Sequence, residues 1–374
     1  MLSPRTVPML WDLYCRVVDN HGDVGVCWRL ATALAALGQQ VRLIIDDASA
    51  LAWMAPHGQP GVTVLPWAAP PVTGDVVVEA FGCDLPTAAV EQLHKTVQRQ
   101  QPAPVWINLE HLSAEPYVER SHGLPSPQPG GLVKWFFYPG FTARTGGLLR
   151  EADLLTAQSR FDRMAWLAGR HITLLPAERV VSLFCYDNPR LAELIQALAE
   201  VPTLLLVAPG PAQQRVAALP RARSTEALPP RRSTAALPKH VRTVALPWLT
   251  QQDFDHLLWA ADINFVRGED SLVRGLWAGK PLVWQAYAQQ DGAHHRKVQA
   301  LIEQFAPAAL PAAVQALWRG WNGAPGVAID LQTLAPGEVS SDWSAAAQSL
   351  RNRLLLQPDL ASQLLRFVMA KRVA

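Results

Sequence analysis

The chain has 374 residues, of which 49% are hydrophobic and 17% are charged, and its formal net charge is +2. A chain of this length exceeds what one ordinary hydrophobic core supports, so we expect two domains. The composition excludes a disordered chain. The small net charge excludes a polyelectrolyte, so an acidic partner would have to be met by a local patch of basic residues.

Cysteine usage and the first residues indicate the compartment. The four cysteines are scattered without CxxC spacing, which argues against a zinc site and a disulfide framework and fits a reducing environment. The opening MLSPRTVPMLWDLYC lacks the charged and apolar segments of a signal peptide, and no apolar run is long enough to span a bilayer. We therefore expect a cytoplasmic protein without a membrane partner.

Strand and helix patterns alternate over the first 109 residues. We expect strands over 9–15, 41–45, 62–65, 75–79 and 105–109, and helices over 24–37, 48–54 and 88–99. This alternation predicts an α/β fold with a parallel sheet that helices cover on both faces.

The loop between the first strand and the first helix is the strongest candidate for chemistry. In YCRVVDNHGDVGVCWRL it holds two carboxylates, Asp19 and Asp23, and its glycines, Gly22 and Gly25, allow a sharp turn and close approach of a ligand. Open α/β sheets bind ligands at the carboxyl ends of their strands, so we predict that both carboxylates are catalytic. The alternative is structural: Asp23 would cap the helix, and Asp19 would stabilise a turn.

Residues 110–151 interrupt the alternation with a segment rich in Pro, Gly, Ser and aromatic residues. A long irregular segment in a compact domain is usually functional or disordered, and its aromatic cluster argues for order. The cluster consists of Trp135, Phe136, Phe137, Tyr138 and Phe141. We weigh two interpretations of this segment equally: it binds an acceptor molecule, or it is a packed surface loop.

A second series of strands and helices begins near residue 171. We expect strands over 180–186, 203–207, 241–246, 262–266 and 281–285, helices over 189–200, 251–259 and 272–278, and helices over most of the remainder. Residues 208–240 are basic, Pro-rich and low in complexity, which predicts a flexible insertion. The insertion lacks aromatic residues that would stack bases, so a solvated loop is favoured over a nucleic-acid contact.

The two series predict domains over 1–168 and 169–374, the second ending in a helical tail. Two αβ domains with such a tail are typical of the GT-B glycosyltransferase shape. A two-domain dehydrogenase is disfavoured, because the glycines of the first loop lack the first member of GxGxxG.

The segment RGEDS opens a helix directly after a strand, where backbone amides and the helix dipole favour phosphate. Arg267 adds a planar, bidentate donor suited to a diphosphate. Of the two acids, Glu269 and Asp270, we expect one to accept sugar hydroxyls and the other to cap the helix. The alternative is a simple capped helix, which accounts for Asp270 and Ser271 but not for Arg267 or Glu269.

Several motifs occur in the order found in a known family. DNHGDVGVCWRL, CDLP, GFTARTGGLLRE, FCY, PWLTQQDF and RGEDS resemble the bacterial elongation-factor-P arginine rhamnosyltransferases, over most of the chain except the insertion and the tail. DNxGDxGxxWRL together with RGEDS is highly specific. The resemblance implies an inverting GT-B enzyme, with two Rossmann-like domains that face a cleft. It implies transfer of L-rhamnose from TDP-β-L-rhamnose to an arginine side chain of elongation factor P.

The resemblance also implies roles for domains and residues. The N-terminal domain would hold the protein acceptor, and the C-terminal domain would hold the nucleotide sugar. The implied catalytic carboxylates are Asp19 and Asp23, with Glu269 needed for turnover. The implied nucleotide contacts are Phe184, Tyr186, Gln251, Phe254, Arg267, Asp270 and Ser271. No cofactor is implied, because TDP-rhamnose is a substrate.

The residues fit this chemistry on physical grounds. Aromatic rings such as Phe184 and Phe254 can sandwich a flat base. An arginine acceptor is hard to activate, since its guanidinium stays protonated up to about pH 12. A pair of carboxylates can orient it, and either Asp19 or Asp23 can take the proton as the new bond forms.

Three further points bear on the function. Asp253 and Asp255 form a nominal DxD, but residues two apart on a helix do not face each other, so we predict no metal. A GT-B enzyme or sugar-nucleotide epimerase acting on a small molecule stays open, although the aromatic segment favours a large acceptor. A non-catalytic module that holds RNA through the basic insertion also stays open, and would leave the three carboxylates idle.

Overall fold

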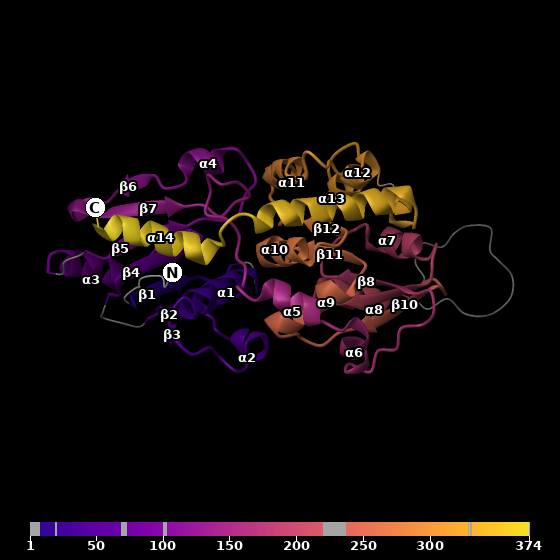
Figure 1. The fold of residues 1–374 in the computed structure, drawn as a ribbon, viewed down its shortest axis with the longest axis horizontal. Helices are drawn as coiled ribbons and strands as arrows, with labels where there is room; N and C mark the ends of the chain where they lie inside the picture. The colour runs from indigo at the N-terminus through magenta and orange to yellow at the C-terminus, as the bar shows by residue number, and fades with distance from the viewer. Residues whose placement is uncertain are drawn as a thin grey trace. The chain divides into compact units, whose positions relative to one another are not determined.

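The computed structural model describes residues 8–18, 21–68, 73–99, 103–219, 237–327, 329 and 331–373, which form two compact units. The first unit comprises Met1–Leu154 and Leu355–Ala374, and the second comprises Leu155–Leu354. Each unit contains its own β-sheet with helices (Figure 1). The predicted pair of α/β domains is therefore confirmed, with boundaries that differ from the expected ones.

The sheet of the first unit has seven strands in the order β3-β2-β1-β4-β5-β7-β6. All neighbours pair in parallel except β6, which runs antiparallel to β7. The strands are β1 (Leu10–Cys15), β2 (Gln40–Ile45), β3 (Val62–Pro66), β4 (Val76–Ala80), β5 (Val105–Leu109), β6 (Pro125–Pro127) and β7 (Val133–Phe137). The five strands expected before residue 110 are all present.

Helices cover both faces of this sheet. They are α1 (Gly22–Ala36), α2 (Leu51–Met54), α3 (Thr87–Val97), α4 (Tyr117–Ser121) and α14 (Leu360–Val373). Apolar residues of α1 and α14 join one hydrophobic cluster with the sheet, whereas Leu93 of α3 joins another with Tyr14 and Trp106. The side chains of successive strand residues alternate between these two clusters.

The last helix corrects the predicted domain boundaries. Residues 355–374 were expected in the second domain, but α14 packs in the first unit, where Figure 1 draws it in yellow beside the purple strands. Leu360, Leu364 and Val368 are buried in the cluster around β1, which supplies the physical reason. At the other boundary, Leu155 begins the second unit, because Trp166 packs into the core of that unit.

The segment over 110–151 is more regular than predicted. It contributes α4, β6 and β7, with a 3₁₀ turn over Pro129–Gly131. Trp135, Phe136 and Phe137 belong to β7, which pairs in parallel with β5, and Phe137 is fully buried. Part of the aromatic cluster is thus sheet core, which favours the packed interpretation for these residues.

His122, in the same segment, predicts a pH-dependent stability. Its Nδ1 accepts the backbone N–H of Tyr138 at 3.0 Å, and its ring packs on Phe137. Burial lowers the pKa of His122 from 6.5, so the folded chain binds fewer protons than the unfolded one. Stability should therefore be retained above about pH 6.5 and should fall as the pH drops below that value. Urea denaturation from about pH 7.5 to 5 should show this decline.

A glutamine at this position provides the matched control. The His122→Gln variant keeps an acceptor for Tyr138 but does not titrate, so its denaturation midpoint should depend less on pH than that of the wild type. His256 and His294, whose pKa values burial also lowers, would retain part of the slope. Identical slopes for variant and wild type would contradict the assignment to His122.

The sheet of the second unit has five parallel strands in the order β10-β9-β8-β11-β12. They are β8 (Arg179–Leu183), β9 (Thr203–Val207), β10 (Val241–Ala245), β11 (Ile263–Arg267) and β12 (Leu282–Gln285). The helices are α5 (Leu154–Arg160), α6 (Arg163–Ala168), α7 (Leu191–Leu198), α8 (Pro211–Ala218), α9 (Gln251–Ala260), α10 (Gly268–Ala278), α11 (Ala293–Glu303), α12 (Ala312–Trp321) and α13 (Glu338–Leu355), with a 3₁₀ turn over Leu331–Leu334.

The start of the basic insertion is also corrected. Residues 208–240 were expected to be flexible throughout, but α8 forms at their beginning, with Ala212 and Val216 buried. Gln213 Nε2 donates to the carbonyl oxygens of Val207 and Leu246, at 3.1 Å and 2.9 Å, and so ties α8 to the sheet. The rest of that prediction, over 220–236, lies outside the described residues.

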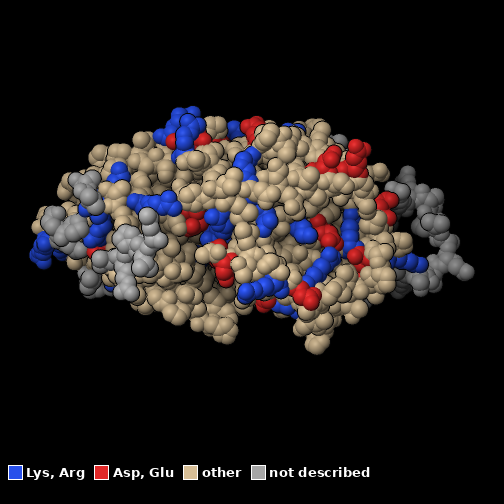
Figure 2. Space-filling model, in the orientation of Figure 1, with Lys and Arg blue, Asp and Glu red and all other residues tan. Residues whose placement is uncertain are grey.

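Two properties of the whole chain bear on its surroundings. Within the described residues, no helix has both the length and the apolar character needed to cross a membrane. On the face drawn in Figure 2, basic and acidic side chains are interspersed and do not form one broad basic field. The described residues on that face therefore carry charges of both signs side by side.

Candidate functional site

Asp23 lies in the first turn of α1, at the carboxyl edge of the first sheet. The helix begins at Gly22, and His21 occupies the N-cap position without a side-chain capping bond. Asp23 is only 6% exposed, and its Oδ2 accepts the backbone N–H of Val18 at 2.8 Å. The expectation that Asp23 is the N-cap is therefore wrong. Its carboxylate instead reaches back to the loop that leaves β1.

Neighbouring residues hold the same loop from the other side. Asp46, which follows β2, accepts the backbone N–H of Val17 at 2.9 Å through Oδ1. The ring of His21 meets Trp53 edge-on, with centroids 5.3 Å apart. Val17 and Val18, after β1, and His21, before α1, thus have defined partners. Asp19, the other member of the pair, lies outside the described residues.

In the second unit, three of the predicted nucleotide contacts form one cluster at the carboxyl ends of β8 and β11. The guanidinium carbon of Arg267 lies 4.4 Å from the ring centroid of Phe184 and 4.6 Å from that of Tyr186. Cation–π contact of this kind stabilises the arginine and fixes its orientation. The structure therefore brings these three residues together.

Phe254 joins this cluster, but in a different geometry from the predicted one. Its ring contacts Phe184 edge-on, with centroids 5.5 Å apart and planes at 70°. Two rings in such contact cannot enclose a flat base between them, so the predicted sandwich of Phe184 and Phe254 does not form in this arrangement. Phe254 instead packs edge-on against Phe184 and against the core of the second unit.

One further aromatic residue was missed by the sequence analysis. Tyr287 follows β12 and meets Tyr186 edge-on, with centroids 5.5 Å apart, while 59% of its side chain remains exposed. Gln285, the last residue of β12, accepts the backbone N–H of Tyr186 at 3.0 Å through Oε1. The only available signal was a tyrosine shortly after the last strand of the second sheet.

The RGEDS segment forms the N-terminal end of α10. Gly268 has φ +64°, and α10 begins there, four residues before the start of the helix expected over 272–278. The hydroxyl of Ser271 accepts the backbone N–H of Arg267 at 3.0 Å and donates to the carbonyl of the same residue. Glu269 and Asp270 are partly buried in the same turn. The predicted helix start next to Arg267 is confirmed.

The two acids of the nominal DxD point to different arginines. Asp253 pairs with Arg170, whereas Asp255 takes two bonds from Arg274, at 2.8 Å and 2.7 Å. Gln251, another predicted nucleotide contact, is the first residue of the same helix, α9. The pairs thus anchor α9 to its neighbours and hold the helix that presents Gln251.

Comparison with known proteins identifies close relatives over the full chain. The family model for the elongation factor P (EF-P) rhamnosyltransferase EarP matches residues 11–369. Protein-arginine rhamnosyltransferases from Pseudomonas putida and Pseudomonas aeruginosa are 43% and 40% identical, with 96% of this chain and 98% of each relative covered. The corresponding protein of Neisseria meningitidis is 33% identical over 97% of this chain.

Solved structures agree with these relatives. A structure that describes EarP-mediated arginine glycosylation of EF-P matches with a TM-score of 0.61 and 28% identity, covering 97% of this chain and 99% of that one. The Streptomyces glycosyltransferase SsfS6 matches at a TM-score of 0.51 with 12% identity, covering 97% and 99%, and this likeness concerns the fold alone. The predicted GT-B architecture is confirmed.

Proposed function

Because this chain belongs to the EF-P rhamnosyltransferase family, we propose that it transfers L-rhamnose to an arginine side chain of elongation factor P. The donor is TDP-β-L-rhamnose, and the reaction is that of an inverting protein-arginine rhamnosyltransferase of the hexosyltransferase class. The observation that carries this proposal is the match over residues 11–369, which includes both candidate sites. The first unit receives the protein acceptor, and the second unit binds the nucleotide sugar.

The cluster around Arg267 supports the donor role of the second unit. Its guanidinium, held over Phe184 and Tyr186, and the amides at the start of α10 offer positive charge to a diphosphate. The same groups stabilise the negative charge that the leaving TDP develops. The proposed nucleotide contacts are Phe184, Tyr186, Gln251, Phe254, Arg267, Asp270 and Ser271.

Asp23 supports the acceptor role of the first unit. A guanidinium nitrogen attacks the anomeric carbon from the face opposite TDP, the bond from that carbon to the diphosphate oxygen breaks, and the configuration inverts. The attacking nitrogen loses one proton to a carboxylate, either Asp19 or Asp23. The other carboxylate orients the guanidinium by charge-assisted hydrogen bonds. Glu269, in the first turn of α10, is the third carboxylate needed for turnover.

The reaction as proposed uses no metal and no cofactor. Charge on the diphosphate is balanced by Arg267 and by helix amides, and the proton passes to a side chain. A cytoplasmic location follows from the acceptor, because a translation factor works in that compartment. Neither a membrane nor a nucleic acid takes part.

The direct test is to incubate the purified protein with EF-P and TDP-β-L-rhamnose and to record the intact mass of the acceptor. We expect the mass of one deoxyhexose to be added. An unmodified acceptor, together with transfer to a small molecule, would support the alternative of a small-molecule GT-B enzyme.

Phe254→Ala should weaken TDP binding and leave acceptor binding unchanged. The variant removes the ring that contacts Phe184, and Phe184 in turn contacts the Arg267 guanidinium. The expected loss is about 0.5–1.5 kcal/mol of binding free energy, the contribution of one aromatic pair. Titration calorimetry with TDP measures it, and an unchanged affinity would remove Phe254 from the donor site.

A further inference from the structure

The chain turns sharply where it leaves β4, at the carboxyl edge of the first sheet. Phe81 and Asp84 have φ values of +58° and +45°, and Gly82 between them has +64°. Residues other than glycine rarely adopt this left-handed backbone conformation, and those that do cluster at functional sites. A phenylalanine here therefore calls for an explanation beyond the path of the chain.

The unusual backbone decides which way the ring of Phe81 points. Ala80 and Leu109 form the last pair between β4 and β5, so Phe81 is the first residue after the paired part of β4. Regular alternation would direct it away from the hydrophobic cluster that contains Ala80 and Leu109. Instead, the ring packs against that same cluster, which also includes Val24 of α1. The positive φ thus turns Phe81 toward the face of the sheet that α1 covers.

Phe81 stacks on His111, which lies two residues after the end of β5. Their ring centroids are 4.7 Å apart and their planes differ by 16°. Phe81 is partly buried and His111 is exposed. The imidazole of His111 is therefore the exposed member of the stack, and Phe81 supports it from the core side.

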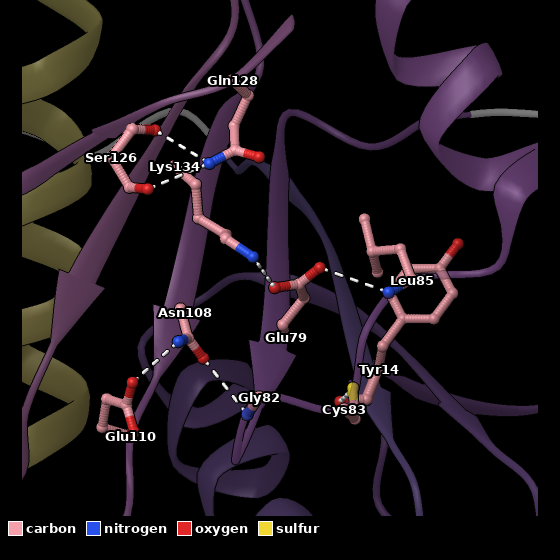
Figure 3. Close-up of polar contacts among 10 residues, drawn as sticks. All are labelled: Tyr14, Glu79, Gly82, Cys83, Leu85, Asn108, Glu110, Ser126, Gln128 and Lys134. Carbon is pink, nitrogen blue, oxygen red and sulfur yellow. Dashed lines mark hydrogen bonds and ion pairs between the residues drawn. The ribbon is translucent and has the colours of Figure 1, made fainter.

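The surroundings hold this turn in place. Asn108 accepts the backbone N–H of Gly82 at 3.2 Å and donates to Glu110 Oε1 at 2.8 Å. Figure 3 shows Asn108 between these two partners, with Glu110 beyond the end of β5. One buried amide thus fixes both the turn that carries Phe81 and a carboxylate beside it.

The same edge and face carry Asp23. β1 and β4 are neighbours, with Tyr14 opposite Glu79, so Arg16 leaves β1 at the level at which Phe81 leaves β4. Val24, adjacent to Asp23 in α1, packs in the cluster that Phe81 contacts. The Phe81–His111 pair and Asp23 therefore lie at the carboxyl ends of neighbouring strands, on the same edge of the first sheet.

We propose that the stacked Phe81–His111 pair is the surface on which the acceptor arginine rests while Asp23 engages its guanidinium. Guanidinium groups are planar and stack readily on aromatic faces, which orients them without consuming their hydrogen-bond donors. The donors stay available to carboxylates. The inference rests on the proposed function and adds two substrate-contacting residues to it.

The first experiment compares Phe81→Leu with wild type. Leucine retains apolar contact with the cluster but has no aromatic face. We expect the KM for EF-P to rise about fivefold to tenfold, the range of a partly desolvated cation–π contact, while TDP affinity stays unchanged. Phe81→Tyr, which keeps an aromatic face, should have the same KM for EF-P as the wild type. Phe161→Leu is the matched control, because Phe161 stacks on His256 in the second unit, with centroids 5.1 Å apart.

The second experiment asks which acceptor group the Phe81–His111 pair contacts. The affinity of wild type, Phe81→Leu and His111→Ala for EF-P is measured without TDP-rhamnose, using native EF-P and a variant with the target arginine replaced by alanine. We expect each substitution to weaken binding of native EF-P only. Equal losses for both acceptors, or no loss for native EF-P, would overturn the proposed contact. Failure of wild-type rhamnosylation with these affinities intact would instead overturn the proposed function.

Discussion

Asp23→Asn should lower kcat by about 100-fold or more, the range typical of the loss of a general base. Asparagine keeps the size of the side chain and an oxygen that can accept the Val18 N–H, which Asp23 accepts at 2.8 Å. It removes the negative charge that orients a guanidinium and the basicity that takes its proton. The substitution therefore tests the chemistry of this carboxylate with little change in the loop.

Three measurements separate this expectation from a structural role. Affinity for TDP should hardly change, because we assign the nucleotide to the second unit. The double variant with Asp19→Asn should be little worse than the poorer single variant, since residues that act as a unit are not additive. Asp23→Asn that melts early but retains normal turnover at low temperature would return Asp23 to a structural role.

Asp255→Ala should destabilise the second unit by about 3–5 kcal/mol, the cost of leaving a buried charge without its partner. Asp255 and Arg274 are 6% and 2% exposed, and two hydrogen bonds join them at 2.8 Å and 2.7 Å. The pair connects α9 to α10, so its loss should also weaken TDP binding. Urea denaturation and calorimetry with TDP measure the two effects.

An exposed ion pair in the same unit supplies the control. Arg190 and Glu193 lie 3.1 Å apart with side chains 40% and 47% exposed, so water screens their attraction. Glu193→Ala should therefore cost less than about 1 kcal/mol. Equal midpoints for Asp255→Ala and Glu193→Ala would show that burial of the first pair does not matter for stability.

Local patterns predicted most of the fold correctly. Strands such as Val105–Leu109 are short apolar runs bounded by turn residues, and this signal needs no tertiary information. β7 was missed because its sequence, VKWFF, follows several prolines and glycines, and only pairing with β5 makes it a strand. The sequence also did not predict that α14 packs in the first unit, because the pattern of an amphipathic helix does not indicate which core it completes.

The sequence also predicted one candidate site and missed part of the other. The aromatic contacts of Arg267 agree with the residues that the motifs singled out, since Phe184 and Tyr186 follow one strand and Arg267 ends its neighbour. The Phe81–His111 stack could not be foreseen. It depends on a positive φ at Phe81, and a phenylalanine is among the last residues from which such a backbone would be predicted.

The return of α14 has a consequence for the order of events during synthesis. Leu360, Leu364 and Val368 emerge from the ribosome after the whole second unit, yet they fill the core beside β1. Domains usually fold as they emerge, N-terminal first. The first unit therefore cannot complete its core until the second unit has been synthesised, and part of its apolar interior stays uncovered until then. Production of active enzyme is thereby coupled to completion of both units.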